Sequence, residues 1–159
     1  MRGIVRMKDT KAVVLLLLGA FLTGLTLVCP KLGFLEWISL SPVAYFLFLN
    51  CEKLRYRSLF KYGFLFFFCF YLVSYHWFIY LYPLDFVEGM TPVSALVVVV
   101  AASCGLSAFQ AIGGGVVFVA LKLLFCKRMM QKFGLLKPFV AAAVWCMFEW
   151  CQTLFWFGV

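Results

Sequence analysis

The feature that most constrains this chain is the length of its uncharged stretches. From Val93 the sequence carries no charged residue until Lys122. A helix that crosses the hydrocarbon core of a membrane needs about 20 apolar residues, so this stretch is long enough for a tilted or over-length span. Shorter apolar stretches lie before and after it, and the predicted spans cover about residues 12–28, 34–50, 62–82, 93–121 and 138–159. The sequence therefore predicts an all-α, polytopic transmembrane bundle of about five spans in a single domain.

The composition excludes a water-soluble protein. Hydrophobic residues make up 66% of the 159 positions and charged residues only 13%, whereas ordinary soluble domains hold about 45–50% and about 25%. A small soluble domain buries only about two thirds of the surface that its unfolded chain exposes, so it could not hide this much apolar side chain. A globular soluble domain, a disordered tail and a disulfide-stapled secreted module are all excluded.

The positive charges predict how the chain is oriented. Lys and Arg number 14 against six acids, and they cluster in the N-terminus, in residues 51–61 and in residues 122–137. Residues 29–36 and 83–92 are poorly basic, so the two kinds of segment alternate along the chain. Because basic loops stay in the cytoplasm, we expect a cytoplasmic N-terminus and five crossings. The net charge of +8 is then explained by topology, and we expect no nucleic-acid partner.

The two ends of the sequence indicate how the chain begins and ends. The first apolar run, residues 13–28, is longer than a cleavable signal core of roughly 7–15 residues and has no small residue before Cys29, which favours an uncleaved span. At the other end, residues 155–159 (FWFGV) show no polar tail. We therefore expect the sequence to be the truncated N-terminal part of a longer protein.

No motif for metal, cofactor or nucleophilic chemistry is present. The seven cysteines include no CxxC pair, and His76 is the only histidine that could join them as a ligand. Neither a Ser-His-Asp order nor a Cys-His pair of the nucleophilic type occurs. We expect no metal, no cofactor and no catalytic residue in this chain.

Two ionisable residues fall inside predicted spans. Glu149 lies near the middle of the fifth span, where an acid costs about 2.5–3.5 kcal/mol on insertion and should have a partner. It is either functional or a hydrogen-bonded structural acid. His76 lies at a depth within roughly 4–5 Å of Glu149, counted from the cytoplasmic ends of their spans. The two could form a buried pair, or His76 could lie in an interfacial aromatic belt beside Trp77 and Tyr80.

Small residues recur at every fourth position of the fourth span: Ser103, Ser107, Ala111 and Gly115. This spacing lets two helices approach closely in lipid, so the stripe predicts helix packing rather than catalytic serines.

Three segments resemble the membrane portion of the apolipoprotein N-acyltransferase family. Residues 35–43 (LEWISLSPV) are similar to its early W-x-x-L-x-P-L segment. Tyr62-Gly63-Phe64, His76-Trp77 and residues 89–92 (GMTP) are similar to its G-F-x-x-G helix, aromatic end and G-G-x-P loop. Residues 138–158 are similar to P-x-x-W-x-x-x-E-x-x-R followed by G-F-P-W. Gln152 stands where the family usually has Arg, and the last motif stops before its Pro-Trp.

The resemblance implies an eight-helix membrane domain with an external nitrilase-like domain. Members move an acyl chain from phospholipid, through a cysteine thioester, to the N-terminal diacylglyceryl-cysteine of lipoproteins. Their Glu-Lys-Cys catalytic set belongs to the nitrilase-like domain, so the resemblance leaves open whether this chain is an enzyme and implies that it is inactive alone. The resemblance also implies the bacterial cytoplasmic (inner) membrane, with phospholipid and lipoprotein as partners.

The residues expected to line a substrate groove or to be buried and polar are Glu149, His76, Trp77, Trp145 and Gln152. Of these, Glu149 and Trp145 match positions of the family motif. The alternative function is a small non-enzymatic membrane protein, an accessory or transport subunit.

Overall fold

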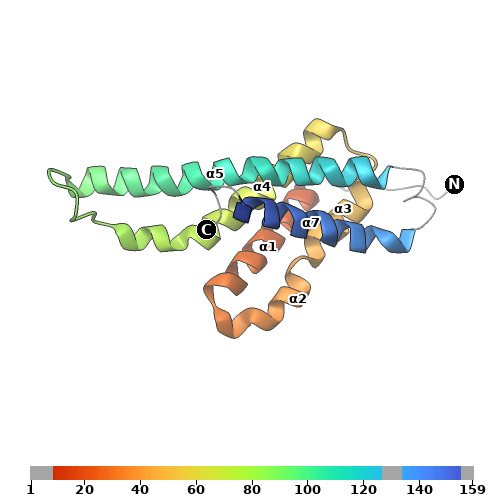
Figure 1. The fold of residues 1–159 in the computed structure, drawn as a ribbon, viewed down its shortest axis with the longest axis horizontal. Coiled ribbons are helices and arrows are strands. Elements are labelled where there is room, and N and C mark those ends of the chain that lie inside the picture. Colours follow the sequence, from red (N-terminus) through yellow and green to blue (C-terminus); the bar gives the residue numbers. More distant parts are fainter. Residues whose placement is uncertain (1–8, 127–133, 155–159) are drawn as a thin grey trace.

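The computed structural model describes residues 9–126 and 134–154, and within them it contains only helices and connecting turns, with no strand (Figure 1). The expectation of an all-α bundle is confirmed. The elements in chain order are α1 Asp9–Val28, the 3₁₀ helix η1 Pro30–Leu35, α2 Glu36–Ser39, α3 Ser41–Asn50, α4 Tyr56–Ser74, the 3₁₀ helix η2 Tyr75–Leu81, α5 Pro92–Phe125, the 3₁₀ helix η3 Gly134–Leu136 and α7 Lys137–Leu154.

Four helical segments are long and apolar enough to cross a membrane: Thr10–Val28, Tyr56–Leu81, Pro92–Phe125 and Gly134–Leu154. The second predicted span, residues 34–50, differs because it is divided among the end of η1, α2 and α3. Leu40 forms a turn between α2 and α3, and Pro42 lies in the first turn of α3, where its missing N–H is tolerated. With ten residues, α3 is too short to cross the hydrocarbon core by itself.

Two helices extend further into the basic segments than the sequence predicts. The third span begins at Tyr56 instead of residue 62 and therefore includes Lys61, and the fourth continues through Lys122 to Phe125. Lys and Arg are good helix formers whose long side chains can reach water, so a charge at the membrane surface does not end a helix. Residues 155–159 of the fifth predicted span lie outside the described residues.

The centre of the bundle is the close crossing of α4 and α5. A methyl group added to Gly63 would lie 2.9 Å from the carbonyl oxygen of Gly114, and one added to Gly114 would overlap the side chain of Phe67. The two helices therefore approach at their glycines. In the stripe predicted from the sequence, Ser107, Ala111 and Gly115 are buried and Ser103 is half-buried. Around the crossing lie the buried rings of Phe46, Phe66, Phe67 and Phe118.

Helix α1 runs in the same direction as α4. A methyl group at Gly19 would lie 3.6 Å from the ring of Phe66, and one at Gly24 would lie 2.7 Å from the side chain of Val73. The middle of α1 thus faces the middle of α4, and its C-terminal part faces the C-terminal part of α4. Both helices end at the same end of the bundle.

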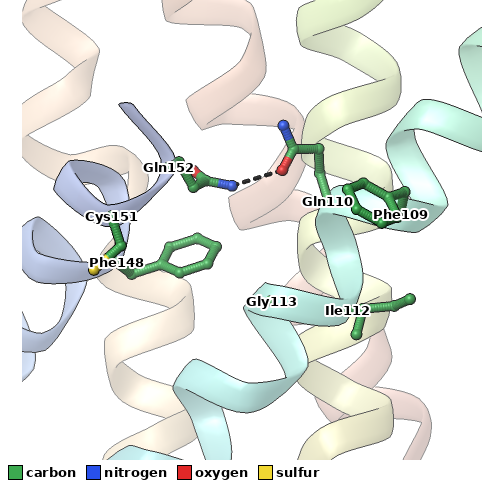
Figure 2. A pocket seen from close by; sticks show the side chains of 7 residues that line it. All are labelled: Phe109, Gln110, Ile112, Gly113, Phe148, Cys151 and Gln152. Atoms are coloured by element: carbon green, nitrogen blue, oxygen red, sulfur yellow. Dashed lines mark hydrogen bonds between the residues drawn. The ribbon is translucent and has the colours of Figure 1, made fainter. Parts of the chain in front are cut away.

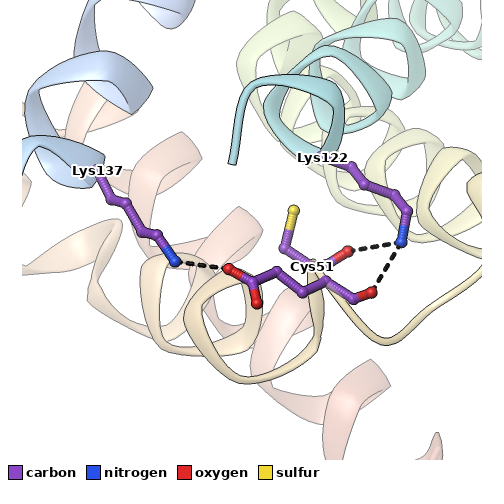
Figure 3. A network of polar contacts seen from close by, with 4 residues as sticks. Cys51, Lys122 and Lys137 are labelled. Atoms are coloured by element: carbon purple, nitrogen blue, oxygen red, sulfur yellow. Dashed lines mark hydrogen bonds and ion pairs between the residues drawn. The ribbon is translucent and has the colours of Figure 1, made fainter. Parts of the chain in front are cut away.

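Two lysines join the segments at the other end. The ammonium of Lys122, near the end of α5, donates hydrogen bonds to the carbonyl oxygens of Cys51 and Glu52 at 3.1 and 3.0 Å (Figure 3). It also donates to the carbonyl oxygen of Leu54 at 2.5 Å. Lys137, at the start of α7, pairs with the carboxylate of Glu52 at 2.6 Å. These contacts bring Lys122 of α5 and Lys137 of α7 together with residues 51–54 at one end of the bundle. We call it the basic end.

Candidate lipid groove

The candidate site lies toward the end of the bundle away from the two lysines. It is a cavity of about 330 Å³, which we call the polar chamber, and the volume is near the lower bound of ligand-binding pockets. All four long helical segments contribute to its lining, which consists of Leu27, Phe70, Tyr71, Ser74, Tyr75, Trp77, Gln110, Glu149, Gln152 and Thr153. It is therefore a product of the assembled bundle and not of one helix.

A network of neutral polar side chains crosses the chamber. The amide nitrogen of Gln152 on α7 donates to the amide oxygen of Gln110 on α5 at 2.8 Å (Figure 2) and lies 3.1 Å from the hydroxyl oxygen of Tyr71 on α4. The amide nitrogen of Gln110 donates to the hydroxyl of Tyr75 at 3.4 Å. Polar groups away from water require such partners, so the network links three helices and η2 at a fixed register.

A second cavity of about 270 Å³, the apolar slot, lies between α5 and α7. Figure 2 shows the residues that line it: Phe109, Gln110, Ile112, Gly113, Phe148, Cys151 and Gln152. Gln110 and Gln152 line both cavities, so the two are neighbours across the amide pair. A methyl group at Gly113 would lie 2.6 Å from the ring of Phe148, so only glycine leaves this approach open.

Four of the five residues predicted from the sequence gather here. Trp77, Glu149 and Gln152 line the polar chamber. The indole nitrogen of Trp145 donates to the carboxylate of Glu149 at 2.5 Å, and its ring stacks on Phe67 with 5.0 Å between centroids. Glu149 is exposed on α7, so the indole of Trp145 gives a hydrogen-bond donor to a carboxylate that other parts of the protein do not bury.

His76 is not part of this group. Its side chain is exposed, its Nδ1 lies 3.2 Å from the carbonyl oxygen of Val73, and its ring packs edge-on against Tyr80. The structure gives His76 and Glu149 different partners and no hydrogen bond or ion pair with each other. Of the two alternatives, this geometry corresponds to a histidine among interfacial aromatic residues.

Sequence reasoning missed three members of the network: Tyr71, Tyr75 and Gln110. Gln110 carried a usable signal, since an amide inside a long uncharged span is costly unless it is hydrogen-bonded. The two tyrosines are four residues apart and stack with 5.6 Å between centroids, but the third span is so rich in aromatic residues that nothing in the sequence distinguishes them.

The thiol of Cys51 is not activated. Cys51 at the basic end is 2% exposed, and burial raises its pKa to about 12, so it stays protonated at neutral pH. Cys151 lines the apolar slot, whose lining holds no positive charge. Among the described residues, no three His, Cys, Asp or Glu side chains come together to hold a metal ion.

The amide pair predicts measurable coupling between α5 and α7. In a double-mutant cycle of Gln110→Leu and Gln152→Leu, we expect a coupling energy of about 0.6–1.7 kcal/mol, the range for polar contacts between membrane helices. The measurement is reversible unfolding in mixed detergent micelles. Gln110→Leu combined with Thr153→Val is the control, because within the described residues the hydroxyl of Thr153 donates only to the carbonyl oxygen of Trp150, and this pair should be additive. Additivity in the glutamine pair would contradict the network.

One protein-family model matches a stretch of the chain that includes the whole candidate site. The family model described as apolipoprotein N-acyltransferase N-terminal domain matches residues 18–159, which include every residue that lines the two cavities. Searches of the curated proteins and of the solved structures find no match to the chain.

Proposed function

Because the chain belongs to the apolipoprotein N-acyltransferase N-terminal domain family, we propose that its helices form the membrane-embedded lipid groove of such an acyltransferase. The reaction would be transfer of an acyl chain from phospholipid to the N-terminal diacylglyceryl-cysteine of lipoproteins, in the bacterial cytoplasmic membrane. The observation that carries the proposal is the polar chamber that adjoins the apolar slot.

The two cavities suit the two parts of a lipid ester. An ester offers carbonyl oxygens that accept hydrogen bonds, and the chamber holds a matching donor in the hydroxyl of Tyr75, which accepts from Gln110 and keeps its own proton to donate. The lining of the chamber holds no Lys or Arg, so it favours the uncharged ester over the phosphate. The acyl chain would lie over Gly113 in the slot, against Ile112 and Phe148.

The groove can be tested with a phospholipid that carries a photoreactive diazirine in its acyl chain. In nanodiscs that hold the purified chain, we expect cross-links concentrated in residues 109–113 and 148–152. Gly113→Leu should reduce them to the level of other lipid-facing residues, because the leucine fills the slot beside Phe148. Gly105→Leu on the same helix is the matched control, since nothing lies within 4 Å of a methyl group there. Even labelling of the whole surface, unchanged by Gly113→Leu, would overturn the groove.

We further propose that these residues bind lipid without transferring the acyl chain. A thioester mechanism needs a thiolate, and burial raises the pKa of the Cys51 thiol to about 12, which keeps it protonated at neutral pH. When this chain alone is produced in cells depleted of N-acyltransferase, we expect no N-acylated lipoprotein by mass spectrometry of the lipoprotein N-termini. A cell line that produces a complete N-acyltransferase is the positive control. N-acylation by this chain alone would contradict the proposal.

A further inference from the structure

A second groove lies at the basic end and takes no part in the lipid groove described above. It is a cavity of about 440 Å³ formed by Tyr56, Arg57, Phe60 and Lys61 of α4 together with Val119 of α5. The ring of Phe60 lies against Gly115, where a methyl group would come within 2.6 Å of it. Packing of α4 on α5 therefore fixes the apolar wall of this basic groove.

The two cations of the basic groove have no counter-charge in the described part of the chain. Arg57 and Lys61 are four residues apart on α4, so they share one face of the helix, and both are exposed. Neither forms an ion pair or a hydrogen bond with another described side chain. The first turn of α4 holds no acid, and Glu52 in the preceding loop is paired with Lys137. Two positive charges therefore remain beside an apolar wall.

The position of the groove matches the geometry of a membrane surface. It lies at the end of the bundle that carries residues 51–61, Lys122 and Lys137, the side predicted to face the cytoplasm. Basic pockets between helices at this surface attract anionic headgroups, while the apolar walls contact the chains below them. A free phosphate would use the cations but not Phe60 or Val119.

We propose that the basic groove binds an anionic phospholipid of the cytoplasmic leaflet, with its phosphate between Arg57 and Lys61 and an acyl chain along Phe60 and Val119. This site differs from the polar chamber in its position, its charge and the part of the lipid that it recognises. The proposal holds whether or not the chain serves an acyltransferase.

Native mass spectrometry of the full chain, released from detergent with defined lipids, tests the proposal. Phosphatidylglycerol should remain bound at a concentration about tenfold lower than phosphatidylcholine, given the attraction that each surface cation contributes. Arg57→Gln with Lys61→Gln should abolish this preference. Lys11→Gln with Lys53→Gln is the matched control, because it removes the same charge from exposed positions outside the groove and should keep the preference.

A groove-filling variant separates the site from general surface charge. Val119→Trp keeps both cations and occupies the apolar wall, so it should also lose phosphatidylglycerol, with folding checked by helical circular dichroism and elution volume. If the Arg57 and Lys61 variant fails to fold, Val119→Trp decides the question. The proposal would be overturned if both double variants lost the preference for phosphatidylglycerol equally, or if Val119→Trp still bound the lipid. Displacement of the lipid by excess inorganic phosphate would overturn it as well.

Discussion

Gly114→Ala is expected to destabilise the bundle by about 3 kcal/mol, the upper part of the range for overpacking. The added methyl group would overlap the Cβ, Cγ and Cδ2 atoms of Phe67. These atoms lie near the backbone of α4, so a change of rotamer cannot make room and the helices must separate. The measurement is the free energy of unfolding in mixed micelles, supported by loss of near-ultraviolet circular dichroism from the aromatic core.

Gly105→Ala provides the control on the same helix. A methyl group at Gly105 meets nothing within 4 Å, so this variant should be neutral or more stable by up to about 1 kcal/mol through helix propensity. Gly63→Ala should resemble Gly114→Ala, because its methyl group would lie against the carbonyl oxygen of Gly114. Equal effects at Gly105 and Gly114 would show that the close crossing does not determine stability.

Lys122→Met is the other substitution with a large expected effect, a loss of about 3 kcal/mol. Lys122 is only 8% exposed, and its ammonium is hydrogen-bonded to three carbonyl oxygens of the turn between α3 and α4, two of which Figure 3 shows. It also lies 5.2 Å from the centre of the Tyr56 ring. Methionine preserves the length and the apolar contacts of the side chain but leaves the carbonyls without their donor. The loss should appear in the free energy of unfolding.

Lys137→Met is the matched control for Lys122→Met. It removes one charge from the same end of the bundle, but its pair with Glu52 is partly exposed and should contribute at most about 1 kcal/mol. Lys122→Arg should lie between the two, because a planar guanidinium keeps the charge but fits three converging carbonyls less well. Similar losses for Lys122→Met and Lys137→Met would contradict a special role for the buried ammonium.

The four long helical segments were predictable because a membrane leaves few alternatives to a helix for a long apolar stretch. The division of residues 34–50 was not, since apolar composition is the same for one continuous helix and for two short ones. What decides it is local: Pro42 is accommodated in the first turn of α3, and the chain turns at Leu40. Neither the composition nor the periodicity of this stretch contains that information.

The candidate site was predictable only in part, for a related reason. The sequence of α7 identifies Glu149, Trp145 and Gln152 as candidates, because polar or amphipathic side chains on an apolar helix need hydrogen-bond partners. Gln110 and Tyr71 meet them only through the register of three helices, which depends on contacts between residues distant in sequence, such as Gly114 with Phe67 and Gly113 with Phe148. The depth predicted for His76 presupposes a continuous α-helix, but after Ser74 the chain tightens into the 3₁₀ helix η2, which changes the direction in which its side chains point.

Helix α5 is longer than a membrane span requires. Its 34 residues measure about 51 Å, and fitting them within a hydrocarbon core of about 30 Å would need a tilt near 54°, beyond the usual limit of about 40°. Part of the helix must therefore leave the hydrocarbon. Figure 1 shows its N-terminal part extending past the ends of α1 and α7 beside η2. We therefore expect the loop of residues 82–91, which precedes this part of α5, to lie outside the hydrocarbon core.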